Sequence, residues 1–280
     1  MRLKGLLHIG SIDLHKETFR SFFSSDMDTY ASAVAFQMLF AVVPFIIVMI
    51  TILGFFDLEW LYQIINEHAD TVIPGDAAQI VEQVVDEIEK PAGGLISIVL
   101  LIALWLASSA FRSVTHALNI VHKVDESRPF WTRFPLSIIY TIAIALMLIL
   151  ALLFMIVGSQ VLEWITGLVN LDNIFIVLWK WLRWPIAAIL LMITVAFIYF
   201  TAPNKKQKFK DIIPGSVLSV LVWIALSIGF DFYMRTFVDL SILYGSLGAI
   251  IFLLIYFYIS SAVLLYSAKM NVVIERRNSS

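Results

Sequence analysis

The chain has 280 residues, of which 60% are apolar, 14% are charged, and none is cysteine, with a formal net charge of −2. An ordinary soluble domain carries roughly a quarter charged residues, and a soluble globule of this length could not hide so much apolar surface from water. The composition therefore predicts an integral membrane protein and excludes a disordered chain, a coiled coil and a free nucleic-acid-binding protein. The absence of cysteine excludes disulfides, thiolate metal sites and cysteine nucleophiles.

Six apolar segments are long enough to cross a bilayer as helices, which takes about 20 residues each. They lie at about 30–56, 94–122, 135–158, 181–201, 212–233 and 244–268. Because long apolar runs and not alternation carry the signal, the sequence predicts an all-α bundle of six transmembrane helices rather than a barrel. Residues 1–29 form an interfacial N-terminal segment in this interpretation, the membrane domain spans 30–268, and residues 269–280 form a tail.

Lysine and arginine are divided unequally between the two sides of this bundle. Fifteen of them lie in the segments 1–29, 112–134, 202–211 and 269–280, which the six spans place on one side, and four lie on the other: Lys90, Lys180, Arg183 and Arg235. Because positively charged flanks stay in the cytoplasm, we expect both termini to be cytoplasmic and the protein to be a multi-pass membrane protein.

The first outer segment, 57–93, is acidic. Its second half begins after Pro74-Gly75 and places Ile80, Val84 and Ile88 on one face, which is typical of an amphipathic helix. This helix is either a solvated cover over the mouth of the bundle or a lid or cation-attracting vestibule.

Several polar residues interrupt the apolar spans, and such residues mark helix contacts or functional paths. We select eight of them as candidate site residues: Gln37, Pro44, Arg112, Asn119, Asp231, Arg235, Tyr244 and Ser246. Each also has a purely structural interpretation. Arg112 can extend its charge to the membrane surface, Asp231 and Arg235 can form an ion pair four residues apart on one helix, and Pro44 can bend its helix.

Motifs for common enzymatic chemistry are missing from the sequence. There is no phosphate-binding G-x-x-x-x-G-K-[ST] loop, no H-E-x-x-H zinc motif and no G-x-S-x-G nucleophile motif. His116 and His122 are six residues apart and point to different helix faces. We therefore expect no catalytic residues, no metal, no cofactor and no nucleic-acid partner.

Four stretches resemble the YihY/BrkB family of bacterial inner-membrane proteins, which are often mislabelled ribonuclease BN. The stretches are 35–40 with Pro44, 109–119, 213–215 with Trp223, and 244–249 with Tyr258 and Asn271. The resemblance implies six helices in the bacterial inner membrane, and it gives no support to a ribonuclease activity. The chain departs from the family's pattern at Gln37, where an aromatic residue is frequent, and at Lys269, where a glutamate is frequent.

The leading functional hypothesis is a transporter or flippase for an anionic, amphipathic, lipid-like envelope substrate, without an ATPase domain of its own. Arg112 would bind the anionic headgroup, with Gln37, Asn119, Tyr244 and Ser246 lining the polar path. Asp231, Arg235 and Pro44 would gate or couple the movement. The alternatives are a non-catalytic scaffold of an envelope complex and a membrane-embedded lipid-modifying enzyme. The expected partners are membrane lipids, with a second copy of the chain or an envelope protein as a further partner.

Overall fold

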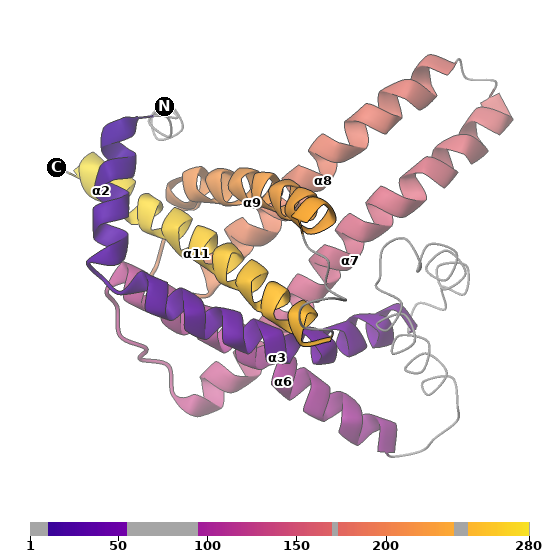
Figure 1. The fold of residues 1–280 in the computed structure, drawn as a ribbon. Coiled ribbons are helices and arrows are strands. Elements are labelled where there is room, and N and C mark those ends of the chain that lie inside the picture. Colours follow the sequence, from indigo (N-terminus) through magenta and orange to yellow (C-terminus); the bar gives the residue numbers. More distant parts are fainter. Residues whose placement is uncertain (1–10, 55–94, 170–172, 238–245, 280) are drawn as a thin grey trace.

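The structure is a computed structural model that describes residues 11–54, 95–169, 173–237 and 246–279. These residues form helices and the connections between them, with no strand in the described ranges (Figure 1). The helices are α2 (Ile12–Phe23), α3 (Met27–Gly54), α6 (Leu95–His122), α7 (Phe130–Val169), α8 (Asn173–Thr201), α9 (Phe209–Phe237) and α11 (Ser246–Ser279). All of them except α2 are long and apolar enough to cross a membrane. The all-α class and the six spans expected from the sequence are therefore confirmed.

Helix α2 is short, amphipathic and packed on the bundle. Ser11 caps its first turn by accepting a hydrogen bond from the backbone N–H of Leu14 at 3.3 Å. Leu14, Thr18 and Phe22 recur every four residues and are buried, whereas Phe19 and Phe23 are exposed on the other side. The buried face packs mainly against α11, so the first described helix is held by the last one.

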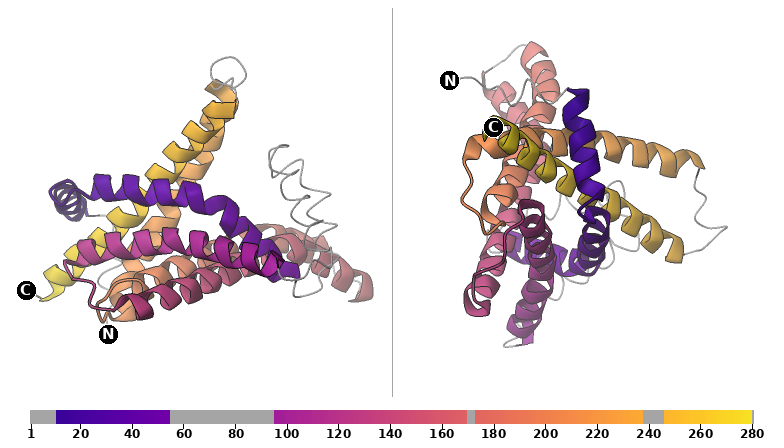
Figure 2. Two further views of the ribbon diagram at one scale, coloured as in Figure 1. Left: turned by 90° about the horizontal axis from the view of Figure 1, so that it is seen from below. Right: turned by 90° about the vertical axis from the view of Figure 1, so that its left-hand side faces the viewer.

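The spans converge at one end of the molecule and diverge at the other. Helix α6 packs against α3, α7 and α11, and α9 packs against α8 and α11. Figure 2 shows the α9–α11 pair leaving the bundle in a different direction from α3, α6 and α7. We call the end where the helices meet, which also holds α2 and the C-terminal part of α11, the terminal end.

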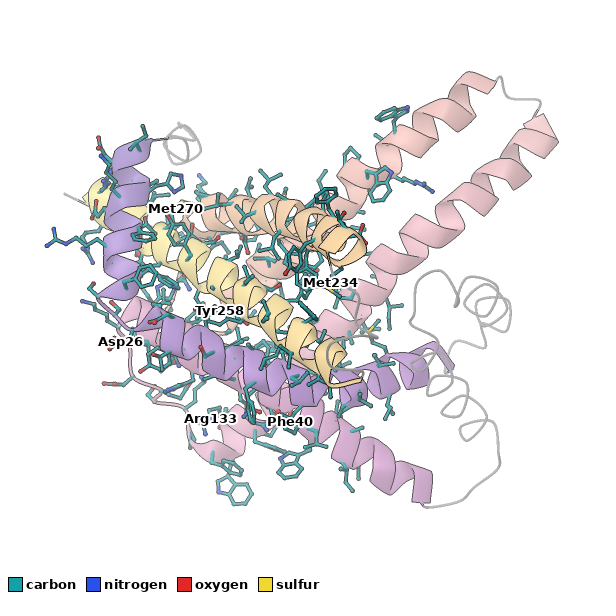
Figure 3. All side chains as sticks on the ribbon, viewed as in Figure 1. Asp26, Phe40, Arg133, Met234, Tyr258 and Met270 are labelled. Carbon is teal, nitrogen blue, oxygen red and sulfur yellow. The ribbon has the colours of Figure 1, made fainter. Side chains whose placement is uncertain are left out.

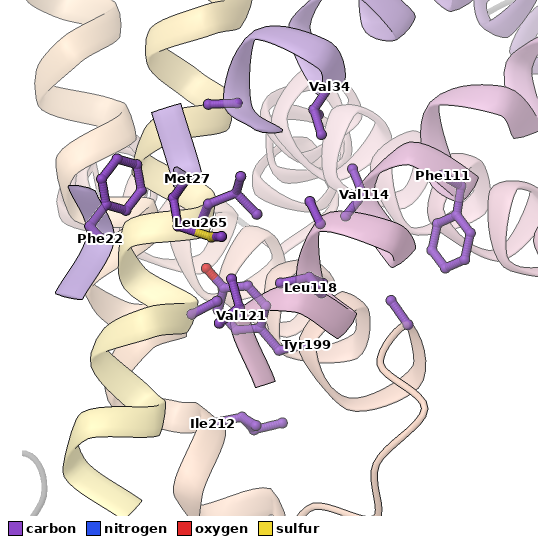
Figure 4. Packing of buried hydrophobic residues seen from close by; sticks show 14 of the residues in the cluster. Phe22, Met27, Val34, Phe111, Val114, Leu118, Val121, Tyr199, Ile212 and Leu265 are labelled. Carbon is purple, nitrogen blue, oxygen red and sulfur yellow. The ribbon is translucent and has the colours of Figure 1, made fainter. Parts of the chain in front are cut away.

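The apolar core lies towards the terminal end. Figure 4 shows five of its residues packed together: Met27 of α3, Leu118 and Val121 of α6, Tyr199 of α8 and Leu265 of α11. Helix α6 is the most central span, with 44% of its most apolar 18-residue window buried, against 17–33% in the other five. The phenolic O–H of Tyr199 donates to the carbonyl oxygen of Leu264 at 2.7 Å, which satisfies the polar end of this large buried side chain.

Some details differ from the sequence-based ranges. Helix α11 continues without a break through the predicted tail to Ser279, and Met270 and Val273 of this part are buried against Leu14 of α2 (Figure 3). Pro44 lies inside α3, which changes direction along its course (Figure 2). The predicted amphipathic helix in 57–93 lies outside the described residues.

Candidate functional site

A stripe of polar residues runs along α6 towards the terminal end. Their spacing of four, three, four and three residues places them on one face of the helix, within about 80° of one another. We call this set the α6 polar stripe: Ser108, Arg112, Thr115, Asn119 and His122. Ser108, Thr115 and Asn119 are buried, although they lie in a helix apolar enough to span a membrane. Polar groups in such a position mark a functional path or an interhelical contact.

Arg112 is held where α6 meets α7. Its Nη1 donates to Ser108 Oγ at 2.5 Å and to Ser137 Oγ of α7 at 3.2 Å. Its Nη2 lies 3.5 Å from the carbonyl oxygen of Trp105, and its Cζ lies 5.3 Å from the centre of the Phe134 ring. Ser108 and Ser137 donate their own hydroxyl hydrogens to backbone carbonyls of their helices, so their lone pairs face Arg112. The guanidinium is therefore fixed in position by neutral groups.

The charge of Arg112 has no carboxylate partner among the described residues. Its close charged neighbour is instead a second cation, Arg133, which lies in the first turn of α7 (Figure 3). A guanidinium has five N–H donors, and the contacts above use three of them. Trp105, whose carbonyl oxygen lies near Arg112 Nη2, is 52% exposed, and Trp131 in the first turn of α7 is 84% exposed. The planar guanidinium is suited to bind two oxygens of an anion such as a phosphate or carboxylate.

Asn119 has a different role from that of Arg112, because it joins two loops. Its Nδ2 donates to Glu126 Oε2 at 2.9 Å, and its Oδ1 accepts from the backbone N–H of Asn204 at 2.7 Å. Arg128 bonds to Glu126 at 2.7 Å and to the carbonyl oxygen of Ala202 at 2.9 Å. We call these four residues, Asn119, Glu126, Arg128 and Asn204, the loop clasp, because they tie loop 123–129 to loop 202–208.

The charges of the loop clasp stabilise each other. Partial burial disfavours the charged form of Glu126, but hydrogen bonds from Arg128 and Asn119, together with the positive charge of Arg128, outweigh it and hold the pKa of Glu126 below its usual value. The side-chain hydrogen bonding to Glu126 and the negative charge of that carboxylate raise the pKa of Arg128 above its usual value despite its burial. The pair is therefore ionised at neutral pH, and it stays ionised under mildly acidic conditions.

The other predicted site residues are not brought to this stripe by any described contact. Gln37 is half-buried on α3, and no hydrogen bond of its side chain is found with the residues that the structure describes. Asp231 is exposed on α9. The side chains of Arg235 and Ser246 and the whole of Tyr244 lie outside the described residues. Of the five residues predicted to bind the substrate, Arg112 and Asn119 share a helix face.

Sequence reasoning missed several residues of this region. His122 continues the stripe, since it lies seven residues after Thr115, and this spacing was visible in the sequence. Ser137, Glu126, Arg128 and Asn204 carried no such signal, because their roles depend on how α7 and the two loops pack against α6. Within the described ranges, no group of three or more His, Cys, Asp or Glu residues is placed to hold a metal ion.

Comparison with known proteins gives a family and named relatives. No solved structure matches the chain. A ribonuclease-like protein of Bacillus subtilis (strain 168), YfkH, is 30% identical over 265 residues, which cover 94% of this chain and 95% of YfkH. UPF0761 membrane proteins of Xanthomonas campestris pv. campestris (strain B100) and Xanthomonas axonopodis pv. citri (strain 306) are 24% identical over 90% of this chain, which spans only 58% of their length.

The family model described as virulence factor BrkB matches residues 18–280, a range that includes all six spans, the α6 polar stripe and the loop clasp. The resemblance noted from the four sequence stretches is thereby confirmed, and the chain is a membrane protein of the BrkB family.

Proposed function

We propose that this protein moves an anionic, amphipathic, lipid-like substrate across the bacterial inner membrane, and that Arg112 binds the anionic headgroup. The observation that carries the proposal is the fixed guanidinium of Arg112, which has no described carboxylate partner and keeps N–H donors available. Placing a cation in a membrane-spanning helix costs free energy. A bound anionic ligand would offset this cost and would explain why an arginine stands at position 112.

The surroundings of Arg112 favour a lipid over a small soluble anion. Trp105 near Arg112 and Trp131 in the first turn of α7 are exposed, and aromatic side chains of this kind are enriched at the level of lipid headgroups. Arg133 adds a second exposed cation at the start of α7. A headgroup phosphate would meet both cations while its acyl chains follow the exposed apolar surface of α6 and α7, such as Leu101 and Ile139.

The polar stripe supports movement and not only binding. Thr115 and Asn119 continue the polar face from Arg112 towards the terminal end, and the Oγ1 of Thr115 is buried with no partner among the described residues. A buried hydroxyl without a partner is costly and marks a place where water or a polar ligand binds. The loop clasp closes the stripe at the terminal end. Opening of the clasp would give the headgroup a route past α6.

The test is lipid identification and transport with purified protein. Wild type, Arg112→Ala and Arg112→Lys are purified in mild detergent and their retained lipids are identified by mass spectrometry. Each is then placed in vesicles that contain fluorescent phosphatidylglycerol, and a membrane-impermeant quencher reports its movement between leaflets. Arg183→Ala is the matched control, because Arg183 also lies near a span end with an aromatic neighbour, 5.6 Å from the ring of Trp184.

We expect an anionic lipid enriched on the wild type, lost from Arg112→Ala and kept by Arg183→Ala. Movement should slow about tenfold or more in Arg112→Ala, since charge-assisted hydrogen bonds are worth roughly 1.5–3 kcal/mol. Arg112→Lys should recover part of the rate, because it keeps the charge but not the planar fork. Normal movement in Arg112→Ala contradicts the proposal and favours a scaffold, and new lipid products in the vesicles would favour an enzyme.

A further inference from the structure

Lys269 is a buried cation at the terminal end that the α6 polar stripe does not include. Its side chain is 1% exposed, and its Nζ donates to Ser25 Oγ at 3.2 Å in the turn between α2 and α3. An ammonium group has three donors, so two of them have no partner among the described residues. Burying an unpaired charge costs several kcal/mol. A lysine that only packed two helices together would not be retained here unless another group compensated its charge.

The charged groups near Lys269 do not supply that compensation. Lys123 and Arg276 are close enough for their positive charges to repel that of Lys269. Lys269 and Lys205 in turn lie close enough to His122 for their charges to act on its ring. One acid of this region, Glu275, is bound by Lys205 at 2.7 Å. Glu275 also follows Lys269 by six residues, which places it on another face of α11. The two described charges that act on Lys269 itself, those of Lys123 and Arg276, are therefore both positive.

Two further polar atoms near this place are buried without a partner in the described part of the chain. One is Nδ1 of His122, at the end of α6, and the other is Oγ1 of Thr18 on α2. Thr18 is 0% exposed and lies on the α2 face that carries Leu14 and Phe22. Leu14 packs against Met270, and the ring of Phe22 lies 6.0 Å from that of Tyr266, so the face of α2 that carries Thr18 packs on residues 266–270 of α11.

We propose that the terminal end holds a second anion-binding site, in which Lys269, with His122, binds an oxyanion of the phosphate class. A phosphate oxygen accepts hydrogen bonds from an ammonium and from an imidazole N–H, and its negative charge balances the neighbouring cations. The site is distinct from Arg112, which lies about 15 Å further along α6 from His122 at 1.5 Å per residue. The phosphate comes either from a lipid headgroup or from free phosphate in the cytoplasm.

The test measures the thermal unfolding of the full chain in mild detergent by tryptophan fluorescence. One arm compares inorganic phosphate with chloride at equal ionic strength. The other arm adds phosphatidylglycerol or phosphatidylcholine to the micelles. The variants are Lys269→Met, which keeps the length of the side chain without its charge, and Lys206→Met, which removes an exposed lysine from loop 202–208.

We expect Tm of the wild type to rise by about 5 °C at saturating anion. A rise with inorganic phosphate identifies a free-phosphate site, and a rise with phosphatidylglycerol alone identifies a headgroup site. Measured in the Arg112→Ala background, which removes the headgroup site proposed above, Lys269→Met should lose the rise and Lys206→Met should keep it. Arg112→Ala should also keep it, so this inference stands or falls separately from the proposed function.

Two results would overturn the inference. The first is an equal rise with and without Lys269→Met in the Arg112→Ala background, which would place the anion elsewhere. The second needs no variant and therefore does not depend on Lys269→Met folding. It is a wild-type Tm that neither anion changes but that increases from pH 7 to pH 10, which would mean that Lys269 is buried in its uncharged form.

Discussion

The side chain of Glu126 makes several of the hydrogen bonds that hold the terminal end together. It lies in a loop of seven residues, yet it accepts hydrogen bonds from Asn119 of α6 and from the backbone and side chain of Arg128. Its side chain is 14% exposed and that of Arg128 is 21% exposed, so solvent screens their attraction less than on an open surface. Removing one partner of such a pair costs more than the pair itself contributes, because it leaves the other charge poorly compensated.

The pH dependence of stability follows from the lowered pKa of Glu126. A carboxyl whose folded pKa lies below its unfolded value, roughly 4.3 for glutamate, contributes stability that is fully present above the unfolded value and is lost as the pH falls through the folded one. We therefore expect Glu126→Gln to lower the free energy of unfolding by about 2 kcal/mol at pH 7 and to remove part of the wild-type loss of stability below pH 5.

Thermal unfolding of the detergent-solubilised protein between pH 3 and pH 7 checks this expectation. Asp125→Asn is the matched control, because Asp125 is exposed and contributes its backbone oxygen, not its carboxylate, to the bond with Asn204. Equal acid sensitivity in wild type and Glu126→Gln would show that the clasp does not depend on the ionised carboxylate.

At the scale of the elements, the crossing of α9 and α11 explains two of the motifs that resembled the family. Pro214 lies inside α9 and has no N–H to donate. Asn271 of α11 bonds to the α9 backbone on both sides of this proline, since its Oδ1 accepts from the N–H of Gly215 at 2.6 Å and its Nδ2 donates to the carbonyl oxygen of Ile212 at 3.2 Å. The two helices can approach this closely only because residue 215 has no side chain.

Gly215→Ala and Gly229→Ala, both in α9, should therefore have opposite effects. A Cβ on Gly215 would overlap Asn271 Nδ2 and lie 2.5 Å from the carbonyl oxygen of Ser267, whereas a Cβ on Gly229 meets nothing within 4 Å. We expect Gly215→Ala to destabilise the protein by about 1–3 kcal/mol through overpacking, and Gly229→Ala to leave it unchanged or stabilise it by up to about 1 kcal/mol. Unfolding of both variants in detergent checks this, and equal stabilities would mean that the crossing can widen without cost.

At the scale of the whole molecule, both described ends of the chain lie together. Arg277 near the end of α11 binds Glu17 of α2 at 2.6 Å and the carbonyl oxygen of Asp13 at 3.2 Å. The loops 123–129 and 202–208 lie at the same end, joined by the loop clasp and, through Lys205 and Glu275, to α11. This shared end carries the larger part of the lysine and arginine residues, which predicts that it faces the cytoplasm.

The absence of cysteine from the chain makes this orientation testable. Single substitutions Asp125→Cys, Lys206→Cys and Asp76→Cys are labelled in intact cells with a maleimide that does not cross membranes. We expect label on Asp76→Cys alone, because residue 76 lies in the acidic segment predicted to be outside, and label on all three after permeabilisation. External labelling of Lys206→Cys would reverse the predicted orientation.

The sequence by itself determined the membrane class, the six spans and the family, because apolar run length and composition are local properties that do not depend on packing. It also contained the spacing that places Arg112 and Asn119 on one face of α6. Only the tertiary structure decided what those residues contact. Asn119 became part of a clasp because loop 202–208 reaches it, and Lys269 became a buried cation because α11 continues through the predicted tail and packs under α2. Such contacts join residues 85 and 244 positions apart, and no local pattern encodes them.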